Sequence, residues 1–243
     1  MTALLEVAGL SKRYGAIVVA DQVTFSLDTG TCLGMIGPNG AGKSSVFNLI
    51  AGTVVPDGGA IRFGGQDLRA LGAHHRARLG IVRAFQIPQP FPHLTVYENV
   101  LAAASFGAGL PAAEAEAWAV QVLADTALAT RAGTLAGLLP LLDRKRLELG
   151  KALASRARLL LLDEIAAGLT EREVDDLVEL VAALKTRHAI IWIEHIPHAL
   201  RAVADRIMVL HFGRNVLEGP PADVMGSQIV REIYMGFAAS DVA

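Results

Sequence analysis

Short apolar runs alternate with turn residues along the first third of the chain. Residues 4–36 hold several such runs, separated by polar and glycine positions, which is typical of β structure. A glycine-rich turn then leads into residues 43–51, for which the pattern predicts a helix. Further strands are predicted around Ile61–Phe63 and over Ile81–Phe85. This part of the chain therefore combines several strands with one helix.

The pattern changes at about residue 88. Pro88, Pro90 and Pro92 interrupt the chain, and Ala-rich stretches follow in which apolar residues recur at helical spacing. We predict a helical subdomain over residues 87–150, inserted into an α/β core.

Strands and helices alternate again after residue 151. Leu159–Leu162 and Ala189–Ile193 are unbroken apolar runs, as expected for strands that are buried on both faces. Apolar residues at helical spacing between Val174 and Leu184 predict a helix that covers this sheet, and Arg206–Leu210 predicts a third strand. The sequence thus predicts one α/β domain over residues 1–243. Its core is formed by two segments, 1–86 and 151–243.

The composition is that of a globular protein, with 52% apolar and 19% charged residues. With 22 basic and 24 acidic residues, the net charge of −2 argues against a nucleic-acid partner held by bulk charge. The single cysteine, Cys32, excludes an internal disulfide. The chain holds no run of 18 apolar residues, so we expect none of it to span a bilayer.

A phosphate-binding motif lies at residues 37–44, which read Gly-Pro-Asn-Gly-Ala-Gly-Lys-Ser and match G-x-x-x-x-G-K-[ST] at every position. A predicted strand precedes it and a predicted helix follows, as the motif requires. Glycines let backbone N–H groups converge on phosphate oxygens, and the helix N-terminus adds its positive dipole end. We expect Lys43 to reach the β- and γ-phosphates and the Ser44 hydroxyl to hold Mg²⁺. A chance glycine turn is a much weaker explanation.

An acidic pair, Asp163 and Glu164, follows the buried strand Leu159–Leu162. Ligands of open α/β sheets lie beyond the carboxyl ends of the strands. We therefore expect Asp163 to reach the Mg²⁺ shell and Glu164 to polarise an attacking water. Acids at the start of a helix would be the ordinary alternative. The phosphate loop favours the metal site, because Mg²⁺ bound to phosphates also takes carboxylate ligands.

Together these motifs resemble the nucleotide-binding subunit of an ATP-binding cassette (ABC) transporter, over nearly the whole chain. The resemblance implies a P-loop NTPase fold. In that fold a RecA-like mixed sheet carries an antiparallel β subdomain and an inserted α-helical subdomain. It makes residues 37–44 the Walker A motif and the acidic pair the Walker B motif with its catalytic glutamate. The residues it assigns to ATP binding are Tyr14, Gly37, Pro38, Asn39, Gly40, Ala41, Gly42, Lys43, Ser44, Ser45 and Gln86.

Three of these roles come from the resemblance alone. Gln86 matches the Q-loop glutamine, which joins Mg²⁺ coordination to the membrane partner. His195 matches the switch histidine that contacts the γ-phosphate, and Tyr14 matches the aromatic residue that stacks on adenine. Taken singly, each could be an ordinary loop or core residue, but their order and spacing favour the joint interpretation. The resemblance thus implies Glu164 and His195 as catalytic residues, and Ser44, Gln86 and Asp163 as ligands of Mg²⁺.

One family motif is altered. The signature Leu-Ser-Gly-Gly-Gln aligns with residues 139–143, which read Leu-Pro-Leu-Leu-Asp, so only Leu139 is kept. In the family, the serine hydroxyl and glycine amides hold the γ-phosphate bound by the opposite subunit. Pro140 offers neither a hydroxyl nor an N–H. Ile165 and Thr170 also depart from the usual proline and D-loop aspartate. We therefore expect the chain to work in a pair of unlike nucleotide-binding subunits.

Within the family, the branched-chain amino-acid importer class is the most similar, on residues 80–86, 91–100, 193–195 and 219–224. This implies uptake of a branched-chain or hydrophobic amino acid, or of a related small amide or acid. The implied partners are integral membrane permease subunits, a second nucleotide-binding subunit and, indirectly, a periplasmic or extracellular solute-binding protein. The implied location is peripheral, on the cytoplasmic face of the inner or plasma membrane.

Two other functions stay open. A soluble ABC ATPase of DNA repair, translation or cofactor assembly is one. However, repair members carry long coiled coils or zinc inserts and translation members carry two cassettes. A regulatory cassette that binds ATP with weak turnover is the other, and Glu164 and His195 argue against it. The apolar loop 87–92 is expected to contact the permease, with a lobe-packing linker as the alternative.

Overall fold

The computed structural model describes residues 3–235. The strands are β1 (Leu5–Tyr14), β2 (Ile17–Leu27), β3 (Cys32–Ile36), β4 (Gly58–Phe63), β5 (Gln66–Asp67), β6 (Ile81–Ala84), β7 (Leu159–Asp163), β8 (Ala189–Ile193), β9 (Arg206–His211) and β10 (Arg214–Gly219). The α-helices are α1 (Lys43–Ala51), α2 (Ala73–Arg78), α3 (Val96–Ala102), α4 (Ala112–Asp125), α5 (Leu141–Ala154), α6 (Glu171–Lys185), α7 (Pro197–Val203), α8 (Pro221–Gly226) and α9 (Gln228–Met235). Short turns of other helix types lie at Ala103–Gly107, Ala129–Arg131 and Ala136–Leu138.

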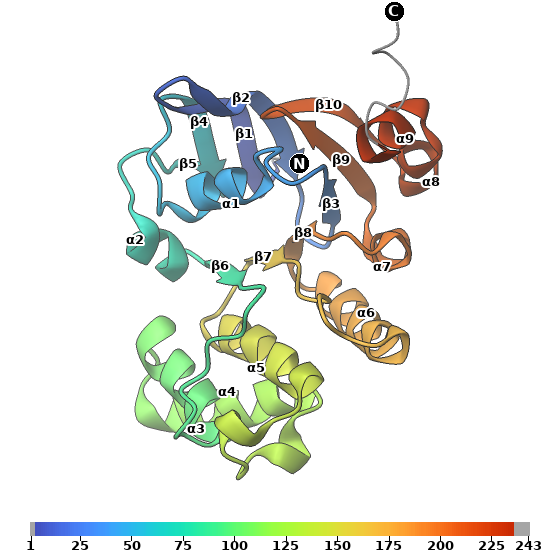
Figure 1. Ribbon diagram of the computed structural model, residues 1–243. Coiled ribbons are helices and arrows are strands. Elements are labelled where there is room, and N and C mark those ends of the chain that lie inside the picture. The colour runs from blue at the N-terminus through green and yellow to red at the C-terminus, as the bar shows by residue number, and fades with distance from the viewer. Residues whose placement is uncertain (1–2, 236–243) are drawn as a thin grey trace, which may run out of the picture.

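The strands form two sheets (Figure 1). A four-stranded antiparallel sheet has the order β2-β1-β4-β5. A six-stranded sheet has the order β10-β9-β3-β8-β7-β6, in which only the β10–β9 pair is antiparallel. Helix α1 packs in the core that the two sheets share. The observed mixed sheet and separate antiparallel sheet confirm the predicted fold class.

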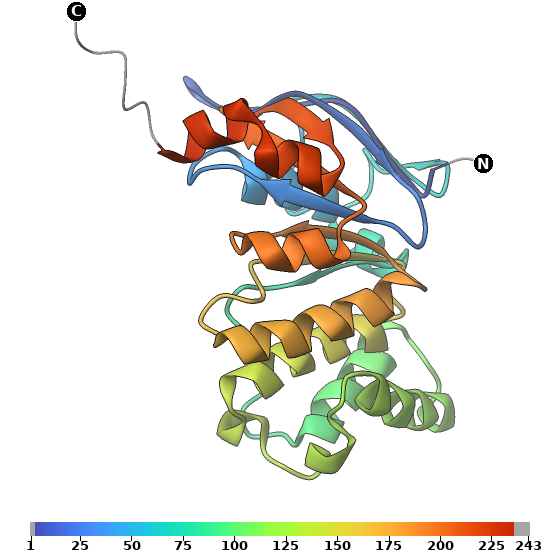
Figure 2. The ribbon, with the colours of Figure 1, turned by 90° about the vertical axis from the view of Figure 1, so that its right-hand side faces the viewer.

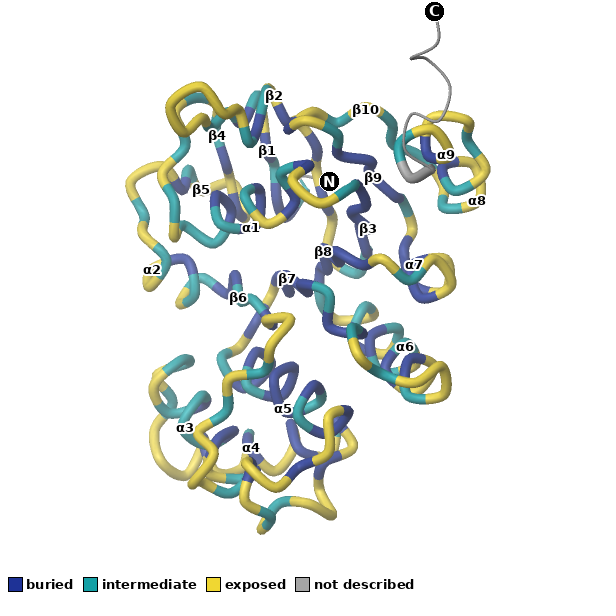
Figure 3. Tube along the Cα trace, viewed as in Figure 1, coloured by how far each residue is buried: buried dark blue, intermediate teal, exposed yellow. Residues whose placement is uncertain are grey.

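The central strands of the six-stranded sheet, β3, β8 and β7, are buried on both faces, whereas β10 at its edge is partly exposed (Figure 3). Side chains of the three central strands alternate between two hydrophobic cores. On β7, Leu159 and Leu161 pack with α1 and the antiparallel sheet, whereas Leu160 and Leu162 pack on the opposite side with α5 and α6. A strand whose alternate residues enter two cores must be apolar throughout. This explains the unbroken leucine run in the sequence.

Helices alone connect β6 to β7, and they form the lower lobe in Figure 1. Figure 2 shows α6 lying between α5 and α7, and α5 also packs directly against β6, so the lobe joins the sheet mainly through α5 and α6. The subdomain boundary expected at residue 150 falls inside α5, which ends at Ala154. The division into core and lobe stays a prediction, and α5 favours a boundary after Ala154. Residues 1–2 and 236–243 of the expected domain lie outside the described part of the chain.

Most predicted elements are confirmed. Helix α1 has the predicted bounds, and β6, β7, β8 and β9 match the predicted strands within a residue or two. Several short elements were not predicted individually, namely β5, α2, α7, β10, α8 and α9. None of the helices within residues 3–235 has the length and apolar character needed to cross a membrane.

Candidate functional site

The glycine-rich loop joins the buried strand β3 to helix α1. Gly37, Gly40 and Gly42 have φ angles of 153°, 81° and 103°, which side-chain-bearing residues rarely adopt. Gly42 is the N-cap residue of α1, and no side chain caps that end of the helix. The first N–H groups of α1 therefore remain available for an anion.

Close packing surrounds two of these glycines. A Cβ atom at Gly42 would lie 2.2 Å from the carbonyl oxygen of Val19, and one at Gly37 would lie 2.2 Å from that of Leu210. The loop is thus held between strands of both sheets. The backbone forms a cradle that a side chain at either position would disrupt.

Lys43 folds back over the loop. It is only 6% exposed, and its Nζ donates to the carbonyl oxygens of Gly37 at 2.7 Å and Pro38 at 3.1 Å. Burial lowers the pKa of Lys43, while Glu164 and Asp163 act in the opposite direction. An ammonium group held by carbonyls beside two carboxylates is well placed to bind phosphate oxygens.

A pocket of about 340 Å³ connects this loop to Glu164 of the acidic pair. Its walls include the residues Ile17, Val19, Asn39, Gly40, Ala41, Gly42, Lys43, Ser44, Ser45 and Glu164. The volume is within the usual range for ligand sites. The structure therefore brings the predicted phosphate loop and the predicted catalytic glutamate to one pocket.

Glu164 links two other predicted residues, Gln86 and His195. Its Oε2 accepts a hydrogen bond from Gln86 Nε2 at 2.8 Å, and its Oε1 lies 2.7 Å from His195 Nε2. The backbone of Glu164 has a φ of 47°, unusual for a residue with a side chain, and its N–H donates to Ile193 O at 2.8 Å. Strands β6, β7 and β8 are neighbours in the sheet, so their carboxyl ends place these three side chains together.

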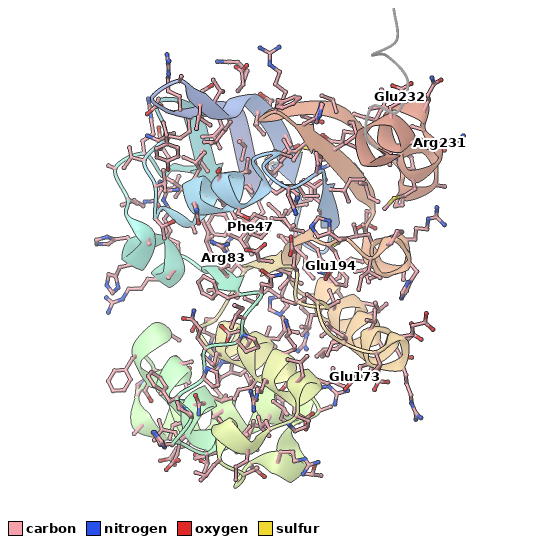
Figure 4. The ribbon with its side chains drawn as sticks, viewed as in Figure 1. Phe47, Arg83, Glu173, Glu194, Arg231 and Glu232 are labelled. Carbon is pink, nitrogen blue, oxygen red and sulfur yellow. The ribbon has the colours of Figure 1, made fainter. Side chains whose placement is uncertain are left out.

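Asp163 has a partner that the sequence analysis missed. Arg83, on β6, forms an ion pair with its carboxylate, and the same guanidinium donates to Asn48 Oδ1 at 2.7 Å. The guanidinium also lies over the ring of Phe47, 5.7 Å from its centre (Figure 4). An arginine within a short buried strand was the available signal, because such a charge needs a partner.

Glu194 is a second missed residue. It is 1% exposed, and its carboxylate accepts hydrogen bonds from the N–H groups of Ala166 at 2.9 Å and His195 at 3.0 Å. Burial raises its pKa, although these two hydrogen bonds lower it. Figure 4 shows Glu194 at the centre of the molecule. It fastens the segment after Glu164 to the segment that carries His195. An acid directly before the candidate histidine was the signal for it.

Tyr14 is not among the residues that line this pocket. It is 53% exposed, and the Lys12 ammonium lies 5.3 Å from its ring centre. The exposed side chain of Ile17 and the neighbouring Val19 line the pocket instead. The adenine-stacking role of Tyr14 stays a prediction.

The residues present fit a Mg²⁺–nucleotide complex. Within residues 3–235 no group of three or more His, Cys, Asp or Glu side chains could hold a metal by itself. Mg²⁺ is usually bound by one or two carboxylates together with substrate phosphates. Asp163, the Ser44 hydroxyl and the Gln86 amide would supply the protein ligands beside a phosphate chain held by the loop.

The altered signature begins a helix. Pro140 is the N-cap residue of α5, and it makes no side-chain capping hydrogen bond. Leu141 and Leu142 form the first turn, where Leu141 is 39% exposed and Leu142 is 8% exposed. This helix start therefore presents an apolar side chain where the family motif has small and hydroxylated residues.

These features define an ATP-binding cassette ATPase. The family model described as "ABC transporter" matches residues 20–167, more than half of the chain, and the chain belongs to this family. As a member it binds and hydrolyses ATP, and the ATP-binding subunits of this family work with membrane permease components.

The chain is 36% identical to the high-affinity branched-chain amino acid transport ATP-binding protein BraF of Pseudomonas aeruginosa, over 97% of this chain and 98% of that protein. It is 35% identical to LivG of Escherichia coli, which has the same description, over the same shares. Among solved structures it resembles the ATP-binding cassette MJ1267 in its ADP conformation. That match has a TM-score of 0.87 and 27% identity, and it covers 97% of this chain and 100% of the other.

Proposed function

We propose that this chain is the ATP-hydrolysing subunit of an importer for a branched-chain or hydrophobic amino acid, or for a related small amide or acid. The resemblance to BraF and LivG over nearly the full length of both partners supports the solute class. The subunit would act at the cytoplasmic face of the membrane, together with permease subunits and, indirectly, a solute-binding protein.

The bridging position of Glu164 is the observation that carries the catalytic part of the proposal. Its carboxylate lies in the pocket of the phosphate loop and contacts both Gln86 and His195. There it would orient a water and accept its proton, while His195 and Lys43 stabilise negative charge on the phosphate oxygens. Bound Mg²⁺ would neutralise further phosphate charge. Phosphoryl transfer needs mainly this positioning and charge stabilisation.

Substitution of the glutamate tests this role. Glu164→Gln keeps the shape and removes the base, so hydrolysis should fall by about 10²–10⁴-fold, as is typical of a lost general base. Nucleotide binding, followed by calorimetry, should persist. Glu173→Gln is a matched control, because Glu173 lies in the capping box of α6 and glutamine also serves that position. Equal hydrolysis by wild type and Glu164→Gln would contradict the role.

We infer that the loop after Gln86 contacts the permease. Ile87 is 74% exposed and Phe91 is 59% exposed, an unusual display for large apolar side chains next to an active site. The loop is nonetheless held in place, since the buried Asn99 accepts a hydrogen bond from Phe91 N at 2.8 Å. Phe91→Ser should abolish co-purification with the permease but leave nucleotide binding intact. Retained co-purification would contradict the contact.

We further infer a pair of unlike nucleotide-binding subunits. In a pair of two copies of this chain, the ATP bound by one copy would face Pro140 and Leu141 of the other copy instead of the hydroxyl and amide donors of the family motif. The Glu164→Gln variant, purified alone, should therefore remain monomeric with Mg²⁺–ATP in light-scattering measurements. It should pair when a cassette with an intact signature is added. A symmetric dimer of this chain with full hydrolysis would overturn this inference.

Reconstitution tests the solute class. Proteoliposomes that contain the permease subunits, both cassettes and the binding protein should accumulate leucine in the presence of internal ATP. They should not accumulate lysine, whose cationic side chain differs from the proposed solutes. If leucine and its apolar relatives are not transported while ATP is hydrolysed, the solute class is wrong and the ATPase assignment stands.

A further inference from the structure

Three charged residues lie along one face of α5. Lys145, Glu148 and Lys151 are spaced three apart, so their side chains follow one another on consecutive turns. Lys145 is 2% exposed and Glu148 is 5% exposed, although Lys and Glu are rarely buried without partners. We call these three residues the α5 ladder.

The partners of the α5 ladder lie in the loop after β6. Lys145 Nζ donates to the carbonyl oxygen of Gln86 at 2.5 Å. Glu148 Oε2 accepts from Gln89 N–H at 3.1 Å, and Lys151 Nζ donates to Gln89 O at 2.7 Å. Lys151 Nζ also donates to Glu148 Oε2 at 2.9 Å, so the two side chains that bind Gln89 are bonded to each other. The helical lobe thus holds the main chain of this loop at two points.

One of these points is the backbone of a site residue. The Gln86 carbonyl binds Lys145 while the Gln86 side chain donates to Glu164 at 2.8 Å. Gln86 is therefore hydrogen-bonded at both ends: its backbone carbonyl binds α5, and its side chain binds the candidate catalytic carboxylate. Lys145 itself contacts neither Glu164 nor the pocket of the phosphate loop.

Charge favours this arrangement. Burial lowers the pKa of Lys145, but the carboxylates of Glu194, Glu148 and Glu164 oppose that effect. An ammonium bound to a carbonyl in a buried place forms a charge-assisted hydrogen bond, which is stronger than a neutral one. Removal of the Lys145 ammonium would leave the Gln86 carbonyl without this donor.

We propose that Lys145 is a positioning residue for ATP hydrolysis, which holds Gln86 in register with Glu164 and so couples the helical lobe to the catalytic carboxylate. The proposal rests on the ATPase activity of the class and not on the identity of the solute.

The proposal is tested by ATPase kinetics in a double-mutant cycle of Lys145 and Gln86. The sample is the full chain co-purified with its permease. Lys145→Met fills the same space without the ammonium. Its kcat should fall about ten- to hundredfold, the usual range for a lost hydrogen bond to a charged group. KM for Mg²⁺–ATP should change less than about twofold, because nucleotide contacts are kept. In a Gln86→Ala background the same substitution should lower kcat less than about twofold, because its target is already removed.

Hydrogen–deuterium exchange on the full chain gives a readout that does not need turnover. Lys145→Met should speed exchange in the peptide around Gln86 and Gln89 and leave α1 unchanged. Lys185→Met is the matched control. Its Nζ ties α6 to Val203 O at 2.9 Å and to Asp205 at 3.0 Å, away from the site. It should change neither kcat nor exchange around Gln86.

The cycle separates positioning from a merely structural role. If Lys145→Met lowers kcat by the same factor with and without the Gln86 side chain, the proposal is overturned. Unchanged exchange around Gln86 also overturns it. Lys145→Gln covers the case in which the methionine variant does not fold, because its amide keeps a donor. Its kcat should lie between those of wild type and Gln86→Ala, and a kcat at or below that of Gln86→Ala counts against the proposal.

Discussion

Gly42 offers a quantitative test of the phosphate cradle. Its φ is +103°, and a Cβ there would lie 2.2 Å from Val19 O. In Gly42→Ala the left-handed backbone costs about 1–2 kcal/mol. Overlap with a backbone atom that cannot move alone adds about 1–3 kcal/mol. The free energy of unfolding should therefore fall by about 2–5 kcal/mol.

Gly40 provides the matched control two residues earlier. Its φ is +81°, and a Cβ there would meet no atom within 4 Å. Gly40→Ala thus carries the backbone cost alone, about 1–2 kcal/mol. The difference between the two variants isolates the overlap with Val19.

Urea denaturation in the absence of nucleotide measures both variants, with thermal unfolding as a second probe. For a chain of this size each kcal/mol corresponds to about 2–4 °C in Tm. Gly42→Ala should also lose nucleotide binding in calorimetry, because the start of α1 must shift away from β2. If the two variants differ in unfolding free energy by less than about 0.5 kcal/mol, the usual error of such comparisons, the close-approach argument is wrong.

Three further predictions concern single side chains. Arg83→Met should lower the free energy of unfolding by about 3 kcal/mol in urea denaturation, because the Asp163 carboxylate loses its cation, and a variant as stable as wild type would contradict that role. Burial lowers the pKa of His188 below its ordinary 6.5, so the unfolded chain binds more protons there and stability should fall as the pH drops below 6.5. In His188→Asn, which keeps a donor for Ala157 O, the free energy of unfolding should fall less steeply as the pH drops below 6.5. If its dependence on pH equals that of wild type, His188 is not the group responsible. Burial raises the pKa of Cys32 to about 12, so this single thiol should resist Ellman's reagent in the folded chain and react fully in urea; rapid native reaction would contradict its burial.

Much of the site could be predicted because its motifs are local. Residues 37–44 lie between a strand and a helix that the apolar pattern already predicts, and the spacing of glycines expresses a backbone requirement. Asp163 and Glu164 follow a strand whose burial on both faces is visible as a leucine run. In such cases neighbouring residues in the sequence carry the whole signal.

Arg83, Glu194 and Lys145 were not predicted as parts of the site, because each has a partner that is distant in sequence. Arg83 pairs with Asp163, which lies 80 residues further along. Lys145 reaches Gln86 across 59 residues. Strand order in the six-stranded sheet brings Arg83 to Asp163, and the packing of α5 against β6 brings Lys145 to Gln86. Both are properties of the folded chain.

Local periodicity and motif spacing thus determined the α/β class, the phosphate loop and the identity of the chemical groups. The tertiary structure alone decided which groups meet. It joined Gln86 and His195 to the two oxygens of Glu164, gave Asp163 an arginine partner, and tied the helical lobe to the site through Lys145. The physical reason is that backbone preferences act over a few residues, whereas buried charges are satisfied by whatever the packed sheet and helices bring within hydrogen-bond distance.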